Sequence, residues 1–414
     1  MARSLAKVTW YAIAALVTTT AVIGAMTSHP VVLAFGVIGL ATGVVAVIWN
    51  RLALQELSYE RVLPQQIVFR GEEIPMTVAL SNNKPVPLAW LRLEDDIPEA
   101  LQIVAGDEPR NVKPNVQTLH HSTSMKWYEK LRWRYQLLCT QRGLYHIGPA
   151  YIESGDPFGV LHSRRSQPRQ DTILVYPQVF TLDELGVPSS RPFGDVLGGA
   201  RIYQDPTRPS GIRDYERGDP LKTVDWKATA RVQRLQVRTY EPSITTTVVL
   251  VVAVDTREPY WDRYERQDLE RVLTVAASMA SYAVGREYAT GLFTNDMPVQ
   301  IRNPLTVPPA RGREQLRLVL GALATVRLYA IQPMAITLAE HSHHFPMGAT
   351  VVVVTAFMPA IFVSALSELR GRGHKVTVLH VGAEACPDLG ESIMVHELRD
   401  HLVEMEEAGE LLAS

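Results

Sequence analysis

The sequence predicts a multi-domain protein, with a transmembrane helical hairpin at residues 1–54, an antiparallel β domain at residues 55–180 and a doubly wound α/β domain at residues 241–414. Three observations predict this order. Two long apolar segments come first, short alternating strands with turn residues follow, and continuous apolar strands then alternate with amphipathic helices. Residues 181–240 join the last two domains as a linker that includes a highly charged stretch.

The composition excludes several classes of function. The 414 residues carry 41 lysines and arginines against 43 aspartates and glutamates, which leaves a net charge of −2 and gives no reason to expect a nucleic-acid partner. Cys139 and Cys386 lie far apart in the sequence, which fits a reducing compartment better than a disulfide framework. No cysteine–histidine spacing indicates zinc, no glycine-rich phosphate loop is present, and no cofactor is expected.

The N-terminal segments 8–27 and 31–49 are each close to the ~20 apolar residues that a helix needs to cross a bilayer core. Pro30 favours a break between them. Glycine and alanine recur in both segments, so we expect the two helices to approach closely. The main alternative is a cleaved signal peptide, which predicts a single, shorter apolar run followed by a polar chain.

Basic residues predict the orientation of this hairpin. Arg3 and Lys7 precede it and Arg51 follows it, while the connection between the two helices has no lysine or arginine. The positive-inside rule then places both termini in the cytoplasm. The sequence therefore predicts a multi-pass membrane protein whose soluble domains face the cytoplasm.

Residues 55–180 show the alternation of half-buried strands. Ile74–Leu80 alternates apolar and polar side chains, and Leu131–Cys139 places Leu131, Trp133, Tyr135 and Leu137 on one face. Seven or so such strands predict an immunoglobulin-like β sandwich. The stretch 106–123 breaks the strand pattern. Asp156-Pro157-Phe158-Gly159 is interpreted as a turn whose Asp156 side chain caps backbone amides, in preference to a metal-binding or kinase-like motif.

The charged stretch runs from Gly211 to Arg231. Gly218-Asp219-Pro220 has turn chemistry, and Val224–Arg231 predicts a short helix. On this helix Lys227 and Arg231 share one face, and Trp226 and Ala230 share the neighbouring face. We expect the aromatic and small side chains of that second face to pack while the cations stay in water. The stretch has three interpretations, namely an ion-paired connector between domains, a recognition surface and a catalytic site.

The C-terminal region has the pattern of a parallel sheet. Thr245–Val254 is a continuous apolar run, typical of a strand buried on both faces, and Asp268–Gly285 predicts an amphipathic helix. Further strands are expected at residues 288–293, 299–302, 350–355 and 375–381, and a closing helix at residues 396–411. Binding sites in such sheets lie beyond the carboxyl ends of the strands, which is where Asp255 and Thr355 are expected.

The charged stretch carries a family resemblance. Gly-x-Arg-Asp-Tyr at 211–215, Gly-Asp-Pro at 218–220 and Trp-Lys-Ala-x-Ala-Arg at 226–231 resemble the signature of the bacterial domain-of-unknown-function 58 family. Arg-Gly-x-Tyr-x-x-Gly-Pro at 142–149 and Asp-Pro-Phe-Gly at 156–159 extend the resemblance upstream. It implies a protein of the bacterial inner membrane, a MoxR-type AAA+ ATPase as partner and often a transglutaminase-like membrane protein as a second one.

The α/β region resembles a von Willebrand factor A domain. That fold often carries a metal site built on Asp-x-Ser-x-Ser, but here Arg257 and Pro259 stand at the two serine positions after Asp255. No aspartate follows Thr355 directly. A hard cation needs several oxygen ligands, so we expect a degenerate site without metal. Asp255 is instead expected to pair with Arg257 or to cap the next helix.

These observations support three hypotheses of function. The first is a membrane-anchored adaptor protein that works with the ATPase on cell-envelope or other complexes, with a contact surface formed by Arg213, Asp214, Asp219, Trp226, Lys227 and Arg231. The second is an enzyme acting on envelope or lipid material through Arg213, Asp214 and Asp219, although no assembled catalytic motif is found. The third is metal-dependent adhesion through Asp255.

Overall fold

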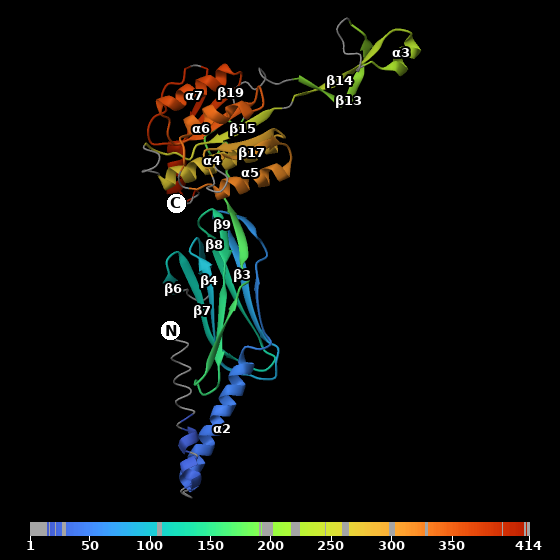
Figure 1. Ribbon diagram of the computed structural model, residues 1–414. Helices are drawn as coiled ribbons and strands as arrows, with labels where there is room; N and C mark the ends of the chain where they lie inside the picture. Colours follow the sequence, from blue (N-terminus) through green and yellow to red (C-terminus); the bar gives the residue numbers. More distant parts are fainter. Residues whose placement is uncertain are drawn as a thin grey trace. The chain divides into compact units, whose positions relative to one another are not determined.

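The structure is a computed structural model, and it forms two compact units, Met1–Val175 and Tyr176–Ser414 (Figure 1). It describes residues 15, 17–20, 22–26, 30–105, 110–189, 192, 202–216, 224–244, 246–258, 265–297, 303–327, 330–390, 392–409 and 411.

The first unit begins with an apolar helical region. Helix α2 (Pro30–Ala53) is long and apolar enough to cross a membrane, and it extends the predicted segment 31–49 by one turn at its C-terminal end. At 1.5 Å per residue its 24 residues measure about 36 Å. Of the other predicted segment, 8–27, residues 15, 17–20 and 22–26 are described and are helical, and the rest lies outside the described residues.

Small residues bring these two helical segments close together, as the sequence predicts. A Cβ atom added to Gly39 would lie 2.9 Å from Cγ1 of Val17, and one added to Gly24 would lie 2.5 Å from the backbone nitrogen of Leu33. A larger side chain at either glycine would therefore push the segments apart.

Among the described residues of the first unit, twelve strands follow and form three antiparallel sheets (Figure 1). The four-stranded sheet has the order β1-β3-β8-β5, the five-stranded sheet β11-β10-β4-β7-β6, and the three-stranded sheet β2-β12-β9. The strand bounds are β1 Leu57–Val62, β2 Ile67–Phe69, β3 Glu73–Asn82, β4 Leu88–Pro98, β5 Leu101–Ala105, β6 Arg110–Lys113, β7 Val116–Met125, β8 Lys130–Cys139, β9 Gly143–Ile147, β10 Ala150–Gly155, β11 His162–Gln167 and β12 Asp171–Tyr176.

The sheets enclose one apolar core. Met76 and Leu80 of β3 and Leu137 of β8 belong to the same buried cluster as Leu91 and Leu93 of β4. The face predicted for β8 is confirmed, because Tyr135 and Leu137 are buried and Leu131 and Trp133 pack against the cluster.

The prediction that residues 106–123 break the strand pattern is wrong for β7. This strand pairs with β4 along its length, in the register Leu93↔His121 and Pro98↔Val116. It was hidden because its inward positions include polar residues. Thr118 is buried and donates a hydrogen bond from its hydroxyl to the Asp96 carboxylate (2.9 Å), and the buried His121 contacts the hydroxyl of Tyr135.

The second unit holds a six-stranded sheet of order β17-β16-β15-β18-β19-β20. Its strands are all parallel to their neighbours except β17, which is antiparallel to β16. The bounds are β15 Thr247–Val252, β16 Ala289–Thr294, β17 Leu305–Ala310, β18 Thr350–Thr355, β19 Lys375–His380 and β20 Met394–Glu397. The order reverses between β15 and β18, as in doubly wound folds.

Helices cover both faces of this sheet (Figure 1). Met334 and Leu338 of α6 and Phe362 and Leu366 of α7 share a core with alternate residues of β15, β18 and β19. On the other face α4 is buried along most of its length, which includes the apolar side of the predicted amphipathic helix. The bounds are α4 Arg266–Gly285, α5 Arg313–Thr325, α6 Met334–His341, α7 Ala360–Gly371 and α8 Arg399–Glu407.

The edge strand expected at 299–302 lies outside the described residues, and β17 is the edge strand that the structure describes beside β16. One detail differs from the prediction. The closing helix expected at 396–411 is shorter than predicted and begins at Arg399, because Met394–Glu397 forms strand β20, which pairs in parallel with β19. Four residues of mixed polarity are too few to show a strand period in the sequence.

Candidate functional site

The carboxyl edge of the six-stranded sheet is the first candidate site. Asp255 follows β15 and is buried, and its Oδ1 accepts a hydrogen bond from Nδ2 of Asn295 (2.7 Å). Its Oδ2 accepts a longer one from the backbone nitrogen of Met334 (3.4 Å), in the first turn of α6. Burial raises the pKa of the Asp255 carboxyl.

The predicted partner of Asp255 was wrong. Arg257 pairs with Glu265 at 3.4 Å, and Asp255 bonds the start of α6 instead of α4, the next helix in sequence. The side-chain amide of Asn295 bonds two residues that follow β15. Its Oδ1 accepts from the backbone nitrogen of Val254, and its Nδ2 donates to Asp255. Asp255 thus ties β15 to the loop after β16 and to α6.

A cleft of about 690 Å³ lies at the same edge, beyond the ends of β15, β18 and β19. Its polar lining includes Thr256, Arg257, Asp268 and Glu384. Asp268 is held by ion pairs with Arg271 (2.8 Å) and Arg399 (3.2 Å). Thr256 is likewise engaged, since its hydroxyl accepts from the backbone nitrogen of Glu265. Across the described ranges, no group of three or more His, Cys, Asp or Glu side chains has a metal-binding arrangement.

The signature residues form a separate structure, which we call the arm and define as residues 202–216 and 224–244. Strand β13 (Ile202–Asp214) pairs with β14 (Gln236–Ile244) as an antiparallel ribbon, and the short helix α3 (Trp226–Val232) lies at its end (Figure 1). The ribbon contributes no strand to the six-stranded sheet. The predicted short helix is therefore confirmed, whereas the predicted linker contains a ribbon.

Asp225 holds the end of the arm together. Its Oδ1 caps α3 by accepting from the backbone nitrogens of Lys227 (3.0 Å) and Ala228 (3.1 Å), and its Oδ2 accepts from Nε of Arg238 on β14 (2.8 Å). The bond from Arg238, together with the backbone donors, lowers the pKa of the Asp225 carboxyl. Sequence reasoning missed Asp225, although an aspartate directly before a short helix is the ordinary N-cap pattern.

A second set of bonds fixes α3 on the ribbon. The backbone nitrogen of Gln236 donates to Oγ1 of Thr229 (3.0 Å), and the backbone nitrogen of Asp225 donates to the carbonyl oxygen of Gln236 (2.8 Å). Gln233 ends the helix with a φ of 55°. The side-chain amide of Gln236 also donates to the Asp214 carboxylate.

The arm brings together five of the six predicted contact residues, and Asp219 lies outside the described residues. Arg213 and Asp214 are exposed at the end of β13, with the Arg213 guanidinium donating to the Asp214 backbone oxygen (3.0 Å). Trp226, Lys227 and Arg231 are exposed on α3.

The expectation that the face shared by Trp226 and Ala230 is packed is wrong. Trp226 is 67% exposed, and α3 buries none of its residues. Ile212, Val232 and Leu235 on the same arm are also exposed. Among the described residues, no further layer covers this seven-residue helix and its two-stranded ribbon, so the apolar side chains stay at the surface.

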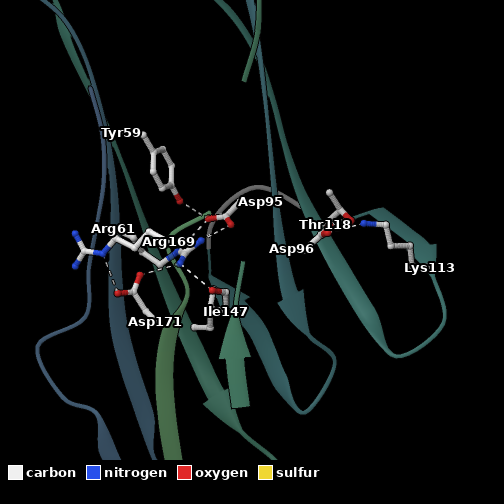
Figure 2. Close-up of polar contacts among 9 residues, drawn as sticks. All are labelled: Tyr59, Arg61, Asp95, Asp96, Lys113, Thr118, Ile147, Arg169 and Asp171. Atoms are coloured by element: carbon white, nitrogen blue, oxygen red, sulfur yellow. Dashed lines mark hydrogen bonds and ion pairs between the residues drawn. The ribbon is translucent and has the colours of Figure 1, made fainter. Parts of the chain in front are cut away.

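The sandwich contains a buried polar cluster, which we assign a structural role (Figure 2). The Arg61 guanidinium binds the carboxylates of Asp95 and Asp171 and the carbonyl oxygen of Ile147, and the Tyr59 hydroxyl donates to Asp95. These residues come from β1, β4, β12 and β9, so the cluster joins all three sheets. Arg169 also pairs with Asp171 (3.3 Å), so two guanidinium groups balance the two carboxylates of the cluster.

Comparisons with known proteins identify one matching family model and one relative. A family model described as "Protein of unknown function DUF58" matches residues 211–410. The Bacillus subtilis (strain 168) protein named "Uncharacterized protein YeaD" is 24% identical over 289 residues. That match covers 68% of this chain and 65% of the relative's length.

Two solved structures resemble parts of the chain. The CARDB domain of a Pyrococcus furiosus protein is 12% identical with a TM-score of 0.20, over 29% of this chain and 91% of that one. A non-cellulosomal cohesin from Archaeoglobus fulgidus is 13% identical with a TM-score of 0.21, again over 29% and 91%. Similarity at this level carries no argument about function.

The matched residues 211–410 begin within the ribbon of the arm and run through the α/β sheet to the end of α8. They include the Gly-x-Arg-Asp-Tyr and Trp-Lys-Ala-x-Ala-Arg motifs on which the resemblance was based. Over these residues the chain matches the DUF58 family model.

Proposed function

We propose that this protein is a membrane-anchored adaptor and that the arm is its partner-binding surface. The observation that carries the proposal is the exposure of Ile212, Trp226, Val232 and Leu235 on a structure whose polar groups already bond one another. Exposed tryptophan beside arginine is typical of the centres of protein interfaces. Lys227 and Arg231 supply positive charge next to this apolar surface.

The anchor is the apolar N-terminal region. Helix α2 has the length and composition of a membrane span, and the glycine contacts with Val17 and Leu33 support a second helix packed beside it. We infer a multi-pass hairpin in a bacterial inner membrane. The distribution of Arg3, Lys7 and Arg51 supports a cytoplasmic location for the soluble units.

The sheet order supports a von Willebrand factor A-like α/β domain. Its strands, numbered along the chain, lie in the order 3-2-1-4-5-6, with the third antiparallel. The donor set after β15 does not fit a divalent cation, because Asp255 already bonds Asn295 and Met334 and because Arg257 brings a cation to the edge. We infer that the domain acts through protein contacts.

The family resemblance supplies the partner class. We propose a MoxR-type AAA+ ATPase as the protein that binds the arm, with a transglutaminase-like membrane protein as a second member of the assembly. The adaptor would present cell-envelope or other complexes to the ATPase. The relative from Bacillus subtilis supports a bacterial setting.

The test is capture of partners from native membranes with the tagged full-length chain, with and without a non-hydrolysable ATP analogue. The Trp226→Ala variant and the Lys227→Glu/Arg231→Glu double variant are expected to lower recovery of the ATPase about tenfold or more. Arg370→Glu, an exposed charge reversal on α7, is the matched control and should recover it normally. Equal recovery by all variants would contradict the assignment of the arm.

The enzyme hypothesis makes a different demand on the same residues. A catalytic carboxylate should lie in a cleft with other reacting groups, whereas Asp214 lies on the exposed ribbon and its carboxylate accepts from Gln236. An Asp214→Asn variant separates the two hypotheses. If the protein is an enzyme, the variant should lose turnover and still capture its partners. If it is an adaptor, the ratio of any captured activity to the amount of captured ATPase should not change.

A further inference from the structure

The end of the sandwich next to α2 carries a set of loops that we call the rim, defined as residues 83–87, 126–129 and 156–161. The strand registers place them at one end. Leu57, just after α2, pairs with Asn82, and Leu88 pairs with Met125. The third loop joins Gly155 to its partner His162, at the end of β10 that adjoins α2.

The rim displays large apolar side chains. Trp127 and Tyr128 are 65% and 67% exposed, and Phe158 and Val160 are 55% and 41% exposed. These four residues belong to loops that connect different pairs of strands, β7 with β8 and β10 with β11. Their common location at one end therefore reflects the fold and not a run of apolar sequence.

The rim is joined firmly to α2. Ala53, the last residue of the helix, is fully buried in the core of the sandwich. Nζ of Lys84, a rim residue, donates to the carbonyl oxygens of Ala53 (2.8 Å) and Gln55 (2.7 Å). A helix end that is buried and capped in this way fixes the height of the rim relative to the apolar helix.

One rim residue reaches alongside the apolar part of α2. Val160 lines a cavity of about 520 Å³ together with Gly43, Ala46 and Val47 of α2. Val47 precedes Ala53 by six residues, or about 9 Å along the helix axis. If α2 spans a bilayer, Val160 is at a depth where water is scarce.

Backbone hydrogen bonds fix the conformation of the 156–161 loop and keep its apolar side chains exposed. The buried carboxylate of Asp156 accepts hydrogen bonds from the backbone nitrogens of Phe158 (2.8 Å), Val160 (3.4 Å) and Leu161, which confirms the predicted turn. Gly155 leaves no room for a side chain, since an added Cβ would lie 2.1 Å from the Leu161 carbonyl oxygen. The loop therefore holds Phe158 and Val160 outward in a fixed shape.

The 126–129 loop is fixed in a similar way. The Glu129 carboxylate accepts from the backbone nitrogen of Lys126 (2.6 Å), and the backbone nitrogen of Tyr128 donates to the Lys84 carbonyl oxygen (3.4 Å). Tyrosine and tryptophan carry an apolar ring with a polar group, and they favour the boundary between lipid and water. Lys126 and Lys130 flank this pair and are exposed.

We propose that the rim is a second membrane contact, in which Phe158 and Val160 enter the upper acyl-chain region of a phospholipid bilayer and Trp127 and Tyr128 lie among the headgroups. This inference rests on the proposed membrane anchoring of α2. The bilayer would cover the four apolar side chains and would restrict tilting of the sandwich about the end of the helix. Lys126 and Lys130 would face lipid phosphates.

The test uses the full-length chain in phosphatidylcholine–phosphatidylglycerol nanodiscs, with single spin labels on a Cys139→Ala/Cys386→Ser background. Labels are placed at Val45→Cys on α2, at Phe158→Cys and Trp127→Cys on the rim, and at Gln170→Cys, an exposed residue beyond the other end of β11. Relaxation by oxygen reports lipid, and relaxation by a water-soluble nickel chelate reports water. If Phe158→Cys lowers the yield of folded protein, Val160→Cys takes its place.

We expect the Phe158 label to resemble the Val45 label, with at least threefold less nickel relaxation than the Gln170 label, and the Trp127 label to be intermediate. If the Val45 label is in lipid while the Phe158 label matches Gln170, the rim contact is overturned and the anchor stands. If the Val45 label is itself open to nickel, the membrane anchor is overturned, and the rim proposal with it.

Discussion

Arg61 and Asp95 form an ion pair in the interior of the sandwich, with side chains 0% and 1% exposed. Arg61 comes from the four-stranded sheet and Asp95 from the five-stranded sheet. Because Arg61 also binds Asp171 of the third sheet at 2.8 Å, one guanidinium holds the three sheets in register. Neither the pair nor its geometry follows from the sequence spacing of 34 residues.

Replacing Arg61 with methionine should destabilise the sandwich strongly. The substitution keeps the apolar stem but leaves the buried Asp95 carboxylate without a cation, which costs about 3–5 kcal/mol for a broken buried pair. Asp171 keeps its ion pair with Arg169 at 3.3 Å. Hydrogen exchange of strands β1 and β4 in the full-length chain measures the loss. Arg92→Met is the control, since Arg92 is half exposed and pairs with Glu153 at 3.7 Å, and it should cost under ~1 kcal/mol. Similar exchange rates in both variants would show that the buried Arg61–Asp95 pair contributes no more to the stability of the sandwich than the exposed pair.

Asp225 should be essential to the structure of the arm. Asp225→Ala removes the helix cap and the bond to Arg238, so the backbone amides of residues 227–233 should exchange several-fold faster. Asp225→Asn keeps the capping oxygen and loses the ionic bond, so it should show a smaller effect. Equal exchange in the alanine variant and the wild type would mean that α3 is held by its bonds to β14 alone.

The α/β unit should lose stability on acidification. Burial lowers the pKa values of His374, His380 and His396 below the ordinary value of 6.5. The histidines of the unfolded chain then bind protons at a higher pH than those of the folded protein. The free energy of unfolding is therefore undiminished above about pH 6.5, and it decreases as the pH falls towards the pKa values of the histidines in the folded state. Each histidine contributes a slope of up to ~1.4 kcal/mol per pH unit in that window.

Protection factors of β18 and β19 between pH 7 and pH 5 measure this loss. His380→Gln, which replaces a residue that is 3% exposed, should flatten the dependence because its side chain does not titrate. A variant with the same pH dependence as the wild type would assign the effect to other groups.

Periodicity allowed most of the α/β unit to be predicted, because the buried faces of its strands and helices are mostly apolar. β18 coincides with the strand expected at 350–355, and α4 begins two residues before the helix expected at Asp268–Gly285 and ends with it. Strands that bury several polar side chains could not be predicted in the same way. β7 buries Gln117, Thr118 and His121, and such residues break an apolar pattern even where they are satisfied by side chains far away in sequence.

The contacts of the candidate sites were harder to predict than their residues. Five of the six proposed contact residues do lie on one arm, because they are close in sequence. The partner of Asp255, however, is Asn295, which reaches it through the parallel pairing of β15 and β16. Long-range pairing of this kind depends on strand order, which a single sequence does not reveal.

Lys84 should control the junction between α2 and the sandwich. Lys84→Met keeps an apolar stem at a site that is 4% exposed but removes the ammonium group that bonds Ala53 and Gln55, which costs about 1–3 kcal/mol for buried carbonyl groups left unpaired. The amides of residues 52–57 should then exchange faster, while those of β8 should not change. Lys126→Met removes an exposed lysine of the same rim and should leave both regions as they are. If Lys84→Met leaves residues 52–57 protected, packing of Ala53 in the core is sufficient to hold the helix end, and the height of the rim does not depend on the lysine.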